Sequence, residues 1–337
     1  MTGYKEKFFL GNLELKNNLI MAPLAGCTDL PFRQMLSHYS VGLMYTEMAK
    51  MEALVRQESS TYRILEKDEG FHPIGAQICG SNLSLVSSSC RILEDLGFDT
   101  IDYNCGCPVD KVVKDGSGSA MLRNPLLIGD VIAEMVNSVD LPITVKVRIG
   151  WDDDNINILD IVEVAEKAGA VAITIHGRTR KQKYTGKSNW EWIKKSKEVA
   201  KTIQVIGNGD VFSPEIAKER FDTTYCDGLL IARGALGSPW LFDNIGAYCK
   251  GETAFFPTKW DKIEALIKHI YYVLQFQNEK KALLDIRRIS CWYLKDFDNS
   301  KGIRKLLMRA KTPEEALQIL GEELYARQEE LSASSSL

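Results

Sequence analysis

Two basic residues and a histidine in this chain could stabilise negative charge on a ligand. Lys146 and Arg148 alternate within a short apolar run, so their side chains point to the same side if that run is a strand. A charge held inside a protein needs a partner. A ligand that develops negative charge fits that need, although a buried Asp could pair with Lys146 instead. His176 ends another apolar run, where it could contact the same ligand or serve a structural role.

Glycine-rich turns follow two further apolar runs. They are Gly207-Asn208-Gly209-Asp210 and Ala232-Arg233-Gly234. Glycine lets backbone N–H groups approach phosphate oxygens, and Arg233 can add a bidentate positive charge. Two ordinary strand-to-helix turns would have the same composition, but these turns follow the seventh and eighth apolar runs, where a TIM barrel usually binds phosphate.

A thiol supplies a third kind of chemistry. Cys107 lies in Asn104-Cys105-Gly106-Cys107-Pro108, at the end of another apolar run. With an ordinary pKa of about 8.5, a cysteine there could be a nucleophile, or a general acid that keeps its proton near neutral pH. Cys27 and Cys79 also lie near the ends of apolar runs, and an inert cysteine is the alternative for each.

Neither a disulfide framework nor a metal site is indicated. The 8 cysteines among 337 residues are too sparse for a disulfide scaffold and include no C-x-x-C pair. The 4 histidines (His38, His72, His176 and His269) are far apart, so no zinc-ligand spacing occurs. We therefore predict reduced thiols and no metal.

The residues singled out above for charge stabilisation, phosphate binding and thiol chemistry stand at or near the ends of short runs rich in Ile, Val and Leu. Such runs are the pattern of strands buried on both faces. The runs cover residues 18–26, 41–50, 73–80, 99–108, 142–150, 169–178, 202–210 and 226–234. Helical segments separate them, with predicted starts at Ser81-Asn82, Asn124-Pro125 and Ser213-Pro214. This alternation predicts a (β/α)8 TIM barrel, whose active face lies at the carboxyl ends of the strands. An open doubly wound sheet is the runner-up, although its GxGxxG turn is missing.

Segments outside these runs complete the predicted architecture. Residues 8–15 have the pattern of a short hairpin, which could plug the lower end of the barrel. Residues 258–330 show apolar positions at helical spacing, with a new cap at Thr312-Pro313-Glu314-Glu315. We predict an α/β barrel domain over residues 1–250 and an all-helical domain over residues 255–331.

Charge is distributed unevenly along the chain. The whole chain has a formal charge of −3, which excludes a polycation built to coat nucleic acid. Residues 280–311 nevertheless hold ten Lys and Arg against three acids, which leaves thirty-two against forty-two elsewhere. Such a basic helical module suits a phosphate backbone, and a solvated helical face is the alternative. The chain shows neither a long apolar run nor a signal peptide, so we expect a cytoplasmic protein without membrane contact.

The ordered motifs resemble those of the tRNA-dihydrouridine synthase family. The resemblance covers residues 18–245 and is carried by Met21 to Asp29 with Pro31-Phe32-Arg33, Asp102 to Pro108, Gly116-Ser117-Gly118, His176 to Arg180, Tyr184, Gly186, Trp190, Gly207 to Asp210, and Gly237 to Trp240. The helical part, with Trp292 to Lys295 and Gly302 to Lys305, is most similar to the bacterial B-type branch. Tyr103 stands where the family pattern leads us to expect an aliphatic residue.

This resemblance implies a flavoprotein oxidoreductase with bound FMN. The FMN phosphate would lie on Asn208, Gly209, Asp210, Ala232 and Arg233, and the isoalloxazine would be lined by Pro23, Leu24, Ala25 and Gln77. Lys146 and His176 would lie near the N1/O2 edge, where reduced flavin gains negative charge. Cys107 would be the family's acid: NADPH or NADH reduces FMN, N5 delivers hydride to C6 of a uridine, and Cys107 protonates C5.

The implied substrate is a uridine extruded from tRNA. Its predicted contacts are Asn104, Arg178, Arg180, Arg287, Arg288 and Arg304, although Arg178 and Arg180 could instead pair with Asp152-Asp153-Asp154. One rival is an FMN-dependent barrel dehydrogenase acting on a small molecule such as a dihydropyrimidine. Another is an RNA-binding or folding-assisting protein on a barrel scaffold. We expect a monomer, and the sequence does not specify which uridine is reduced.

Overall fold

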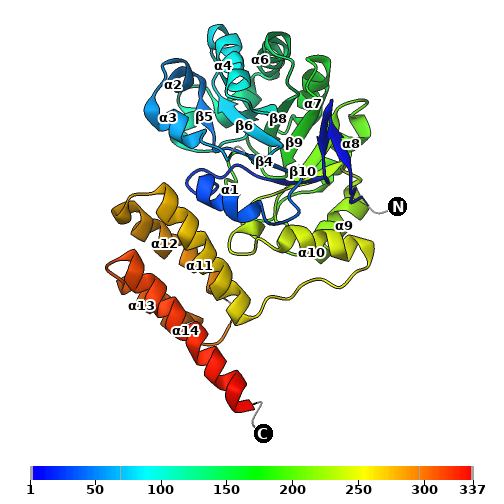
Figure 1. Cartoon of the computed structure of the whole chain (residues 1–337). Helices are drawn as coiled ribbons and strands as arrows, with labels where there is room; N and C mark the ends of the chain where they lie inside the picture. The colour runs from blue at the N-terminus through cyan, green and yellow to red at the C-terminus, as the bar shows by residue number, and fades with distance from the viewer. Residues whose placement is uncertain (1–2, 69, 296, 335–337) are drawn as a thin grey trace.

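Parallel strands close into a barrel at the centre of the chain's larger part (Figure 1). The computed structural model describes residues 3–68, 70–295 and 297–334, with the side chains of 326–334 left out. The barrel strands are β3 (Leu19–Met21), β4 (Leu43–Tyr45), β6 (Ile74–Cys79), β7 (Thr100–Cys105), β8 (Ile143–Arg148), β9 (Ala172–His176), β10 (Gln204–Asn208) and β11 (Gly228–Ile231). Each lies inside one of the eight predicted runs, and pairing of β4 with both β3 and β6 closes the ring, so the predicted barrel is confirmed.

The second run forms two pieces rather than one strand. After β4 the chain leaves the ladder and returns as β5 (Ala49–Lys50), which pairs with the end of β6. Between β4 and β5, the N–H of Thr46 donates to the carbonyl of Gly75. The break places Glu47 and Met48 at the carboxyl end of the barrel.

Strand register brings the chemically suited residues side by side. In the β7–β8 ladder Asn104 lies opposite Lys146, and in the β8–β9 ladder Arg148 lies opposite His176. His176 in turn lies opposite Asn208 of β10. Because parallel strands present the same end together, residues from four strands meet at one face of the barrel.

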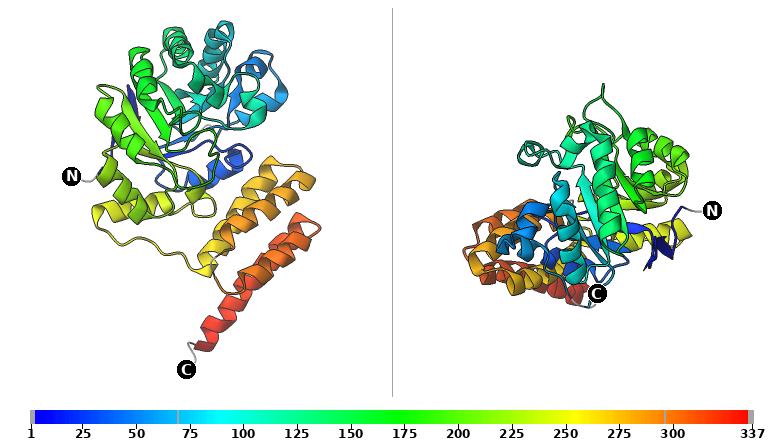
Figure 2. Two further views of the ribbon diagram at one scale, coloured as in Figure 1. Left: turned by 180° about the vertical axis from the view of Figure 1, so that it is seen from behind. Right: turned by 90° about the horizontal axis from the view of Figure 1, so that it is seen from above.

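Helices cover the outside of the barrel (Figure 2). They are α1 (Leu30–Leu36), α2 (Met51–Val55), α3 (Ser59–Ile64), α4 (Val86–Asp95), α5 (Asp110–Val113), α6 (Pro125–Ser138), α7 (Ile158–Lys167), α8 (Glu191–Val199), α9 (Pro214–Thr224) and α10 (Leu241–Lys250). The predicted caps Asn124 and Ser213 each accept a backbone N–H at 3.3 Å. The predicted start at Asn82 is instead a 3-10 turn, Leu83–Leu85, that leads into α4.

The amino-terminal hairpin, β1 (Phe8–Leu10) with β2 (Leu13–Leu15), confirms the predicted plug. Phe8, Leu10 and Leu15 are buried in a cluster with barrel side chains that include Ile20 and Ile206. The hairpin closes the end of the barrel opposite the chemically suited residues, and the cluster continues through the barrel interior to Ala22 and Leu230.

A separate bundle follows α10, as the helical pattern predicted (Figure 1). It contains α11 (Lys259–Phe276), α12 (Glu279–Tyr293), α13 (Ser300–Arg309) and α14 (Pro313–Ser334). Thr258 and Asp261 form a capping box at the start of α11, and Thr312 caps α14. The bundle has its own core, which includes Ile263, Ile286 and Leu307. It joins the barrel where α11 lies against α1.

His269 of α11 lies buried at this junction. Its exposed fraction is 1%, its Nδ1 is 3.2 Å from the hydroxyl of Tyr293, and its ring faces Phe32 of α1 at 5.8 Å between centroids. Burial, and then the charge of Arg288, lower the pKa of His269 to about 3. The imidazole is therefore neutral in the folded protein at neutral pH.

We expect this histidine to make the protein sensitive to acid. Its unfolded pKa is about 6.5, so below that pH the unfolded chain binds a proton that the folded chain refuses. Stability should fall as the pH drops from about 6.5 toward 3, by about 2 kcal/mol at pH 5 from this residue alone.

Urea unfolding of the wild type and His269→Phe at pH 8 and pH 5 measures this effect. The phenylalanine variant should lose about 2 kcal/mol less stability between the two pH values. Only the difference between the two proteins is diagnostic, because other groups titrate equally in both. An identical pH dependence would contradict the assignment.

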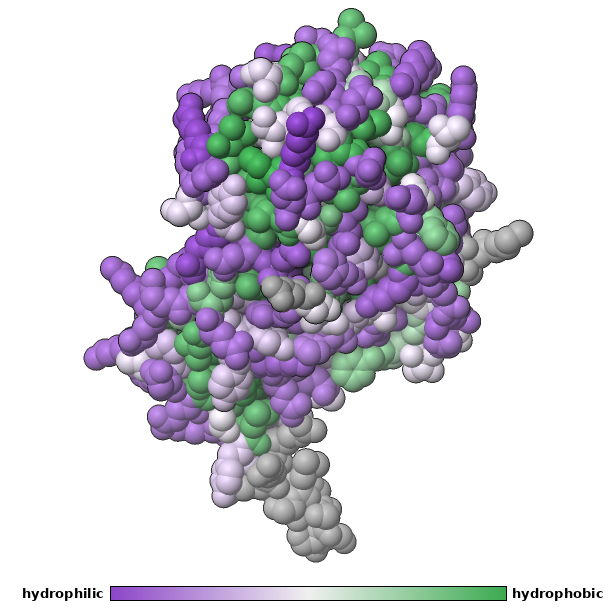
Figure 3. Space-filling model, turned by 45° about the horizontal axis from the view of Figure 1, so that its top comes forward, coloured by the Kyte–Doolittle hydropathy of each residue, from purple (hydrophilic) through white to green (hydrophobic). Residues whose placement is uncertain are grey.

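In the described part of the chain, no helix is long and apolar enough to cross a membrane. On the face drawn in Figure 3 hydrophilic residues predominate, and apolar residues gather among them over the barrel and along the helical bundle.

Candidate active site

A pocket of about 550 Å³ opens at the carboxyl ends of the barrel strands. This volume is in the range of sites for cofactors and small ligands. Its lining contains every barrel residue predicted for the site except Arg180: Pro23, Leu24, Ala25, Gln77, Asn104, Cys107, Lys146, His176, Arg178, Asn208, Gly209, Asp210, Ala232 and Arg233. The structure thus brings together residues from all parts of the barrel.

Cys107 is held in the pocket wall through its backbone. Its N–H donates to Asn104 Oδ1 at 2.9 Å, and its carbonyl accepts from the N–H and hydroxyl of Ser119 at 3.0 and 2.8 Å. Gly118 packs tightly behind it, with a φ of +58°, and a Cβ there would lie 2.9 Å from the Cys107 carbonyl oxygen. These contacts hold the backbone of Cys107 in place and so fix the position of its Cβ.

A chain of hydrogen-bonded side chains leads from the pocket wall to the buried Asp102. Asn104 Nδ2 donates to Gln77 Oε1 at 2.8 Å, and Gln77 Nε2 donates to Asp102 Oδ2 at 2.6 Å. Asn104 Oδ1 accepts from the N–H groups of both Gly106 and Cys107. The polar groups of Gln77 and Asn104 thus have fixed orientations.

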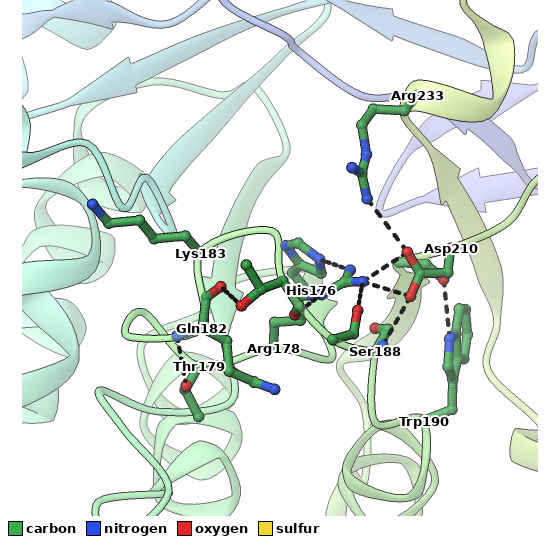
Figure 4. A network of polar contacts seen from close by, with 12 residues as sticks. His176, Arg178, Thr179, Gln182, Lys183, Ser188, Trp190, Asp210 and Arg233 are labelled. Carbon is green, nitrogen blue, oxygen red and sulfur yellow. Dashed lines mark hydrogen bonds and ion pairs between the residues drawn. The ribbon is translucent and has the colours of Figure 1, made fainter.

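His176 stands among positive charges. Burial lowers the pKa of His176 well below its ordinary value, and the positive charges of Lys146, Arg148, Arg178 and Arg233 lower it further. The ring is therefore neutral. Its Nε2 lies 3.2 Å from Arg178 Nη1, which can only donate, so the ring hydrogen is on Nδ1 (Figure 4). His176 is thus a neutral hydrogen-bond donor among Lys146, Arg148, Arg178 and Arg233, the basic residues that we call the cationic wall.

Lys146 is the other donor of this wall. Its Nζ donates to Asn208 Oδ1 at 3.2 Å, and Asn208 Nδ2 donates to the Leu230 carbonyl at 2.7 Å. Burial, and then Arg148, lower the pKa of Lys146, whereas Asp102 and Cys107 raise it. The site as a whole suits a ligand that gains negative charge.

Arg178 is held by contacts inside the protein. Only 2% of its side chain is exposed, and its Nη2 donates to both carboxylate oxygens of Asp210 at 2.9 and 2.7 Å and to the Gly186 carbonyl at 2.6 Å (Figure 4). Arg178 still lines the pocket, but these donors are used inside the protein, so its contact with RNA stays a prediction. It does not pair with the 152–154 loop; it anchors His176 and Asp210.

Backbone donors gather at the ends of β10 and β11. Within the described residues, the N–H groups of Gly209, Asp210, Arg233 and Gly234 donate no hydrogen bond to the protein, and all four residues line the pocket. Gly209 has a φ of +128°, and a Cβ there would lie 2.1 Å from Ser188 Oγ. Arg233 lies 3.4 Å from Asp210 beside these groups. The arrangement fits a phosphate.

Comparison with known proteins now decides the family. A family model described as "Dihydrouridine synthase" matches residues 20–329. The chain belongs to the dihydrouridine synthase family. It is 36% identical to tRNA-dihydrouridine synthase B of Pasteurella multocida over 91% of this chain and 93% of that protein, and 36% identical to the enzyme of the same name of Vibrio cholerae over 92% and 97%. The resemblance to the B-type branch is confirmed.

A third relative agrees with this placement, and a solved structure shares the fold. A probable tRNA-dihydrouridine synthase 1 of Synechocystis sp. is 34% identical over 92% of this chain and 87% of that protein. The histamine dehydrogenase structure from Rhizobium sp. 4-9 has a TM-score of 0.54 at 12% identity over 79% of this chain and 50% of its own. That likeness concerns the fold alone.

In this dihydrouridine synthase family member the thiols differ in their surroundings. Cys27 and Cys107 line the pocket. Burial raises the pKa of Cys79 to about 12 and that of Cys105 well above the ordinary value. Burial also raises the pKa of Cys27, although Arg288 opposes it. Among the described residues, no three His, Cys, Asp or Glu side chains gather as a metal site would require.

The remaining predicted substrate residues make internal contacts. Arg180 donates to Asp110 at 2.6 Å and lies over the ring of Trp151, and therefore does not pair with the 152–154 loop. Arg287 donates to the Ala310 carbonyl, Arg288 pairs with Asp285, and Arg304 is 3.4 Å from the Ser300 carbonyl. Other basic residues of the helical bundle are more exposed: Lys280, Lys281, Lys295, Lys301, Lys305, Arg309 and Lys311.

The pocket rim also includes apolar side chains that the sequence did not single out. Phe212 is 51% exposed and Val109 is 52% exposed, and Met48 lines the wall between the two pieces of the second strand. Arg233 lies 5.9 Å from the Phe212 ring centroid and 5.5 Å from that of Tyr184. The only sequence signal was their position just beyond the strand ends.

Proposed function

We propose that this chain reduces uridine in tRNA to 5,6-dihydrouridine with FMN as cofactor and NADPH or NADH as the hydride donor. The observation that carries the proposal is a pocket that holds a thiol, Cys107, beside a cationic wall with a neutral histidine. Family membership and the tRNA-dihydrouridine synthase B relatives support the same reaction.

The residues present fit FMN. The unpaired N–H groups of Gly209, Asp210, Arg233 and Gly234, with the guanidinium of Arg233, would hold its phosphate. The apolar wall of Pro23, Leu24 and Ala25 would lie along its ring system. When bound, FMN supplies the hydride that the uracil receives. Lys146 and the Nδ1–H of His176 would then stabilise negative charge at the ring edge.

Cys107 acts as the general acid. Its thiol can give a proton to C5 of the uracil when C6 accepts hydride. The thiolate regains a proton from solvent. Asn104, fixed by Gln77 and by the Cys107 N–H, lines the pocket next to the reacting base.

RNA must present an extruded base to this pocket, because the reacting atoms of a stacked base cannot reach it. Unstacking costs a few kcal/mol, which contacts along the RNA backbone can offset. The exposed basic side chains of α12 and α13 are the cations we assign to those contacts. Lys301, Lys305 and Arg309 follow one another at four-residue spacing and form one stripe along α13.

Neutralising this stripe should weaken tRNA binding. In the triple variant Lys301→Gln, Lys305→Gln and Arg309→Gln, the slope of log affinity against log salt should fall by about 2 to 3, at 0.7–0.9 per lost phosphate contact. Filter binding across a salt series measures the slope. Reduction of the flavin by NADPH should be unchanged, because the stripe lies outside the pocket.

The matched control neutralises Lys7, Lys167 and Lys201, three exposed lysines at the opposite end of the barrel. It removes the same charge and should leave the salt slope near that of the wild type. Equal losses in both triple variants would indicate a general charge effect and contradict the assignment of the stripe.

The proposed reaction is tested by absorption spectroscopy without oxygen. Purified protein should be yellow, NADPH or NADH should bleach it, and unmodified tRNA should restore the colour while dihydrouridine appears in the RNA by mass spectrometry. Comparing the two dinucleotides identifies the donor. Folded protein without flavin would overturn the proposal. Colour restored by a dihydropyrimidine-type small molecule but not by tRNA would favour the small-molecule dehydrogenase.

A further inference from the structure

Asp102 is a buried carboxylate that the proposed reaction does not yet use. It lies in β7 beneath the pocket, with 2% of its surface exposed. Each of its oxygens accepts one hydrogen bond of 2.6 Å, Oδ2 from Gln77 Nε2 and Oδ1 from the hydroxyl of Thr144. The Thr144 oxygen is in turn 3.1 Å from the hydroxyl of Tyr45. Burying a carboxylate costs free energy unless its neighbours stabilise it, so the groups around Asp102 indicate what it does in the protein.

The carboxylate determines which way two amides face. An ionised carboxylate only accepts, so Gln77 must turn its NH2 group toward Asp102 and its oxygen toward Asn104. Asn104 then donates through Nδ2, which leaves its oxygen to accept from the N–H of Cys107 at 2.9 Å. Reversing Gln77 would oppose acceptor to acceptor at one end and donor to donor at the other. One charge therefore sets the orientation of every group from β6 to the Cys107 backbone.

Asp102 lies opposite Thr144 in the β7–β8 ladder, so it is two positions from Lys146 on the same face of the neighbouring strand. Within the described residues, Lys146 has no ion pair, and its hydrogen-bond partner is the neutral amide of Asn208. The positive charge of Arg148 opposes protonation of Lys146, and Asp102 is the carboxylate that favours it. Burial raises the pKa of Asp102, while its hydrogen bonds and Lys146 act the other way. The two groups support each other's charge.

We infer that Asp102 is a positioning residue for both halves of the reaction. Through Gln77 and Asn104 it holds the backbone of Cys107, and through its charge it keeps Lys146 protonated beside the cofactor. This inference deepens the proposed function and depends on it. Asp102 itself does not line the pocket, so it acts only through these neighbours.

The test is Asp102→Asn in the FMN-loaded enzyme. An asparagine keeps the size of the side chain but removes the charge and permits the reversed orientation of Gln77. Reoxidation of the reduced flavin by tRNA should slow by about 10- to 100-fold, as expected for a misplaced acid, with tRNA affinity unchanged. The alkaline limb of the pH profile for flavin reduction by NADPH should move to lower pH, because Lys146 loses its proton more easily.

Thr144→Val is the matched control. It removes one hydrogen bond to Asp102 at the same place and leaves the charge, so both effects should be much smaller than in Asp102→Asn. Equal effects in the two variants, or a wild-type pH profile in Asp102→Asn, would overturn the inference and indicate only structural damage.

A second variant tests the same inference if Asp102→Asn folds poorly. Gln77→Leu breaks the connection to Asn104 but keeps Asp102 beside Lys146. Reoxidation by tRNA should slow while the alkaline limb stays in place, and a normal reoxidation rate would overturn the orienting role. Failure of the proposed function is separate, since then the wild type itself would not transfer hydride to tRNA.

Discussion

Replacing Cys107 with alanine should lower the rate of dihydrouridine formation by about 10²- to 10⁴-fold, the range for loss of a general acid. Flavin binding and flavin reduction by NADPH should be retained, because Cys107 contacts its neighbours mainly through backbone atoms that alanine keeps. Anaerobic single-turnover mixing of the reduced enzyme with unmodified tRNA, followed at the flavin absorption band, measures the step directly.

Cys27→Ala provides the comparison, because Cys27 is the other thiol lining the pocket within the described residues. If Cys107 is the acid, the rate loss in Cys27→Ala should be well below that in Cys107→Ala. Normal turnover in Cys107→Ala together with a large loss in Cys27→Ala would transfer the acid role to Cys27.

Replacing Lys146 with methionine should slow reduction of the flavin by NADPH by about 10²- to 10³-fold, the usual effect of removing one preorganised donor from developing negative charge. Methionine fills a similar volume without a charge, and the burial that lowers the pKa of Lys146 no longer acts against folding. Stopped-flow spectroscopy of the oxidised enzyme with NADPH measures the rate, and FMN content and thermal unfolding verify the fold.

Lys183→Met is the control for this variant, because Lys183 is a rim lysine whose side chain is 53% exposed and lies 3.7 Å from Asp110. A surface pair of this kind contributes little, so flavin reduction should stay near the wild-type rate. If Lys146→Met reduced its flavin as fast as Lys183→Met, the cationic wall would have no part in hydride acceptance.

The barrel and its active face could be predicted because their physical causes are local. Strands that are buried on both faces leave short apolar runs, and helix caps such as Asn124 and Ser213 leave polar residues at the run boundaries. Since parallel strands all present their carboxyl ends to the same side, the residues that end the runs had to meet. Cys107, Lys146 and His176 therefore line one pocket, as predicted.

The partners of charged side chains could not be predicted in this way. Arg178 and Lys146 are both basic residues at strand ends that line the pocket, yet Arg178 is paired with Asp210 whereas Lys146 has no ion pair within the described residues. That choice depends on where the loops after β9 and β10 cross, which no local pattern encodes. The same reason explains why Arg287 and Arg304 bind inside the helical bundle and why Arg288 lies between Asp285 of the bundle and Asp29 of the barrel, while lysines nearby remain exposed.

The sequence by itself determined the order of strands and helices, the end of the barrel that carries the chemistry, and the residue types that meet there. Only the tertiary structure decided the direction of each hydrogen bond, as in the amides that connect Asp102 to Cys107. The reason is physical: periodicity and capping act over a few residues, whereas burial and charge pairing depend on side chains that are far apart in the chain and become neighbours only when the barrel closes.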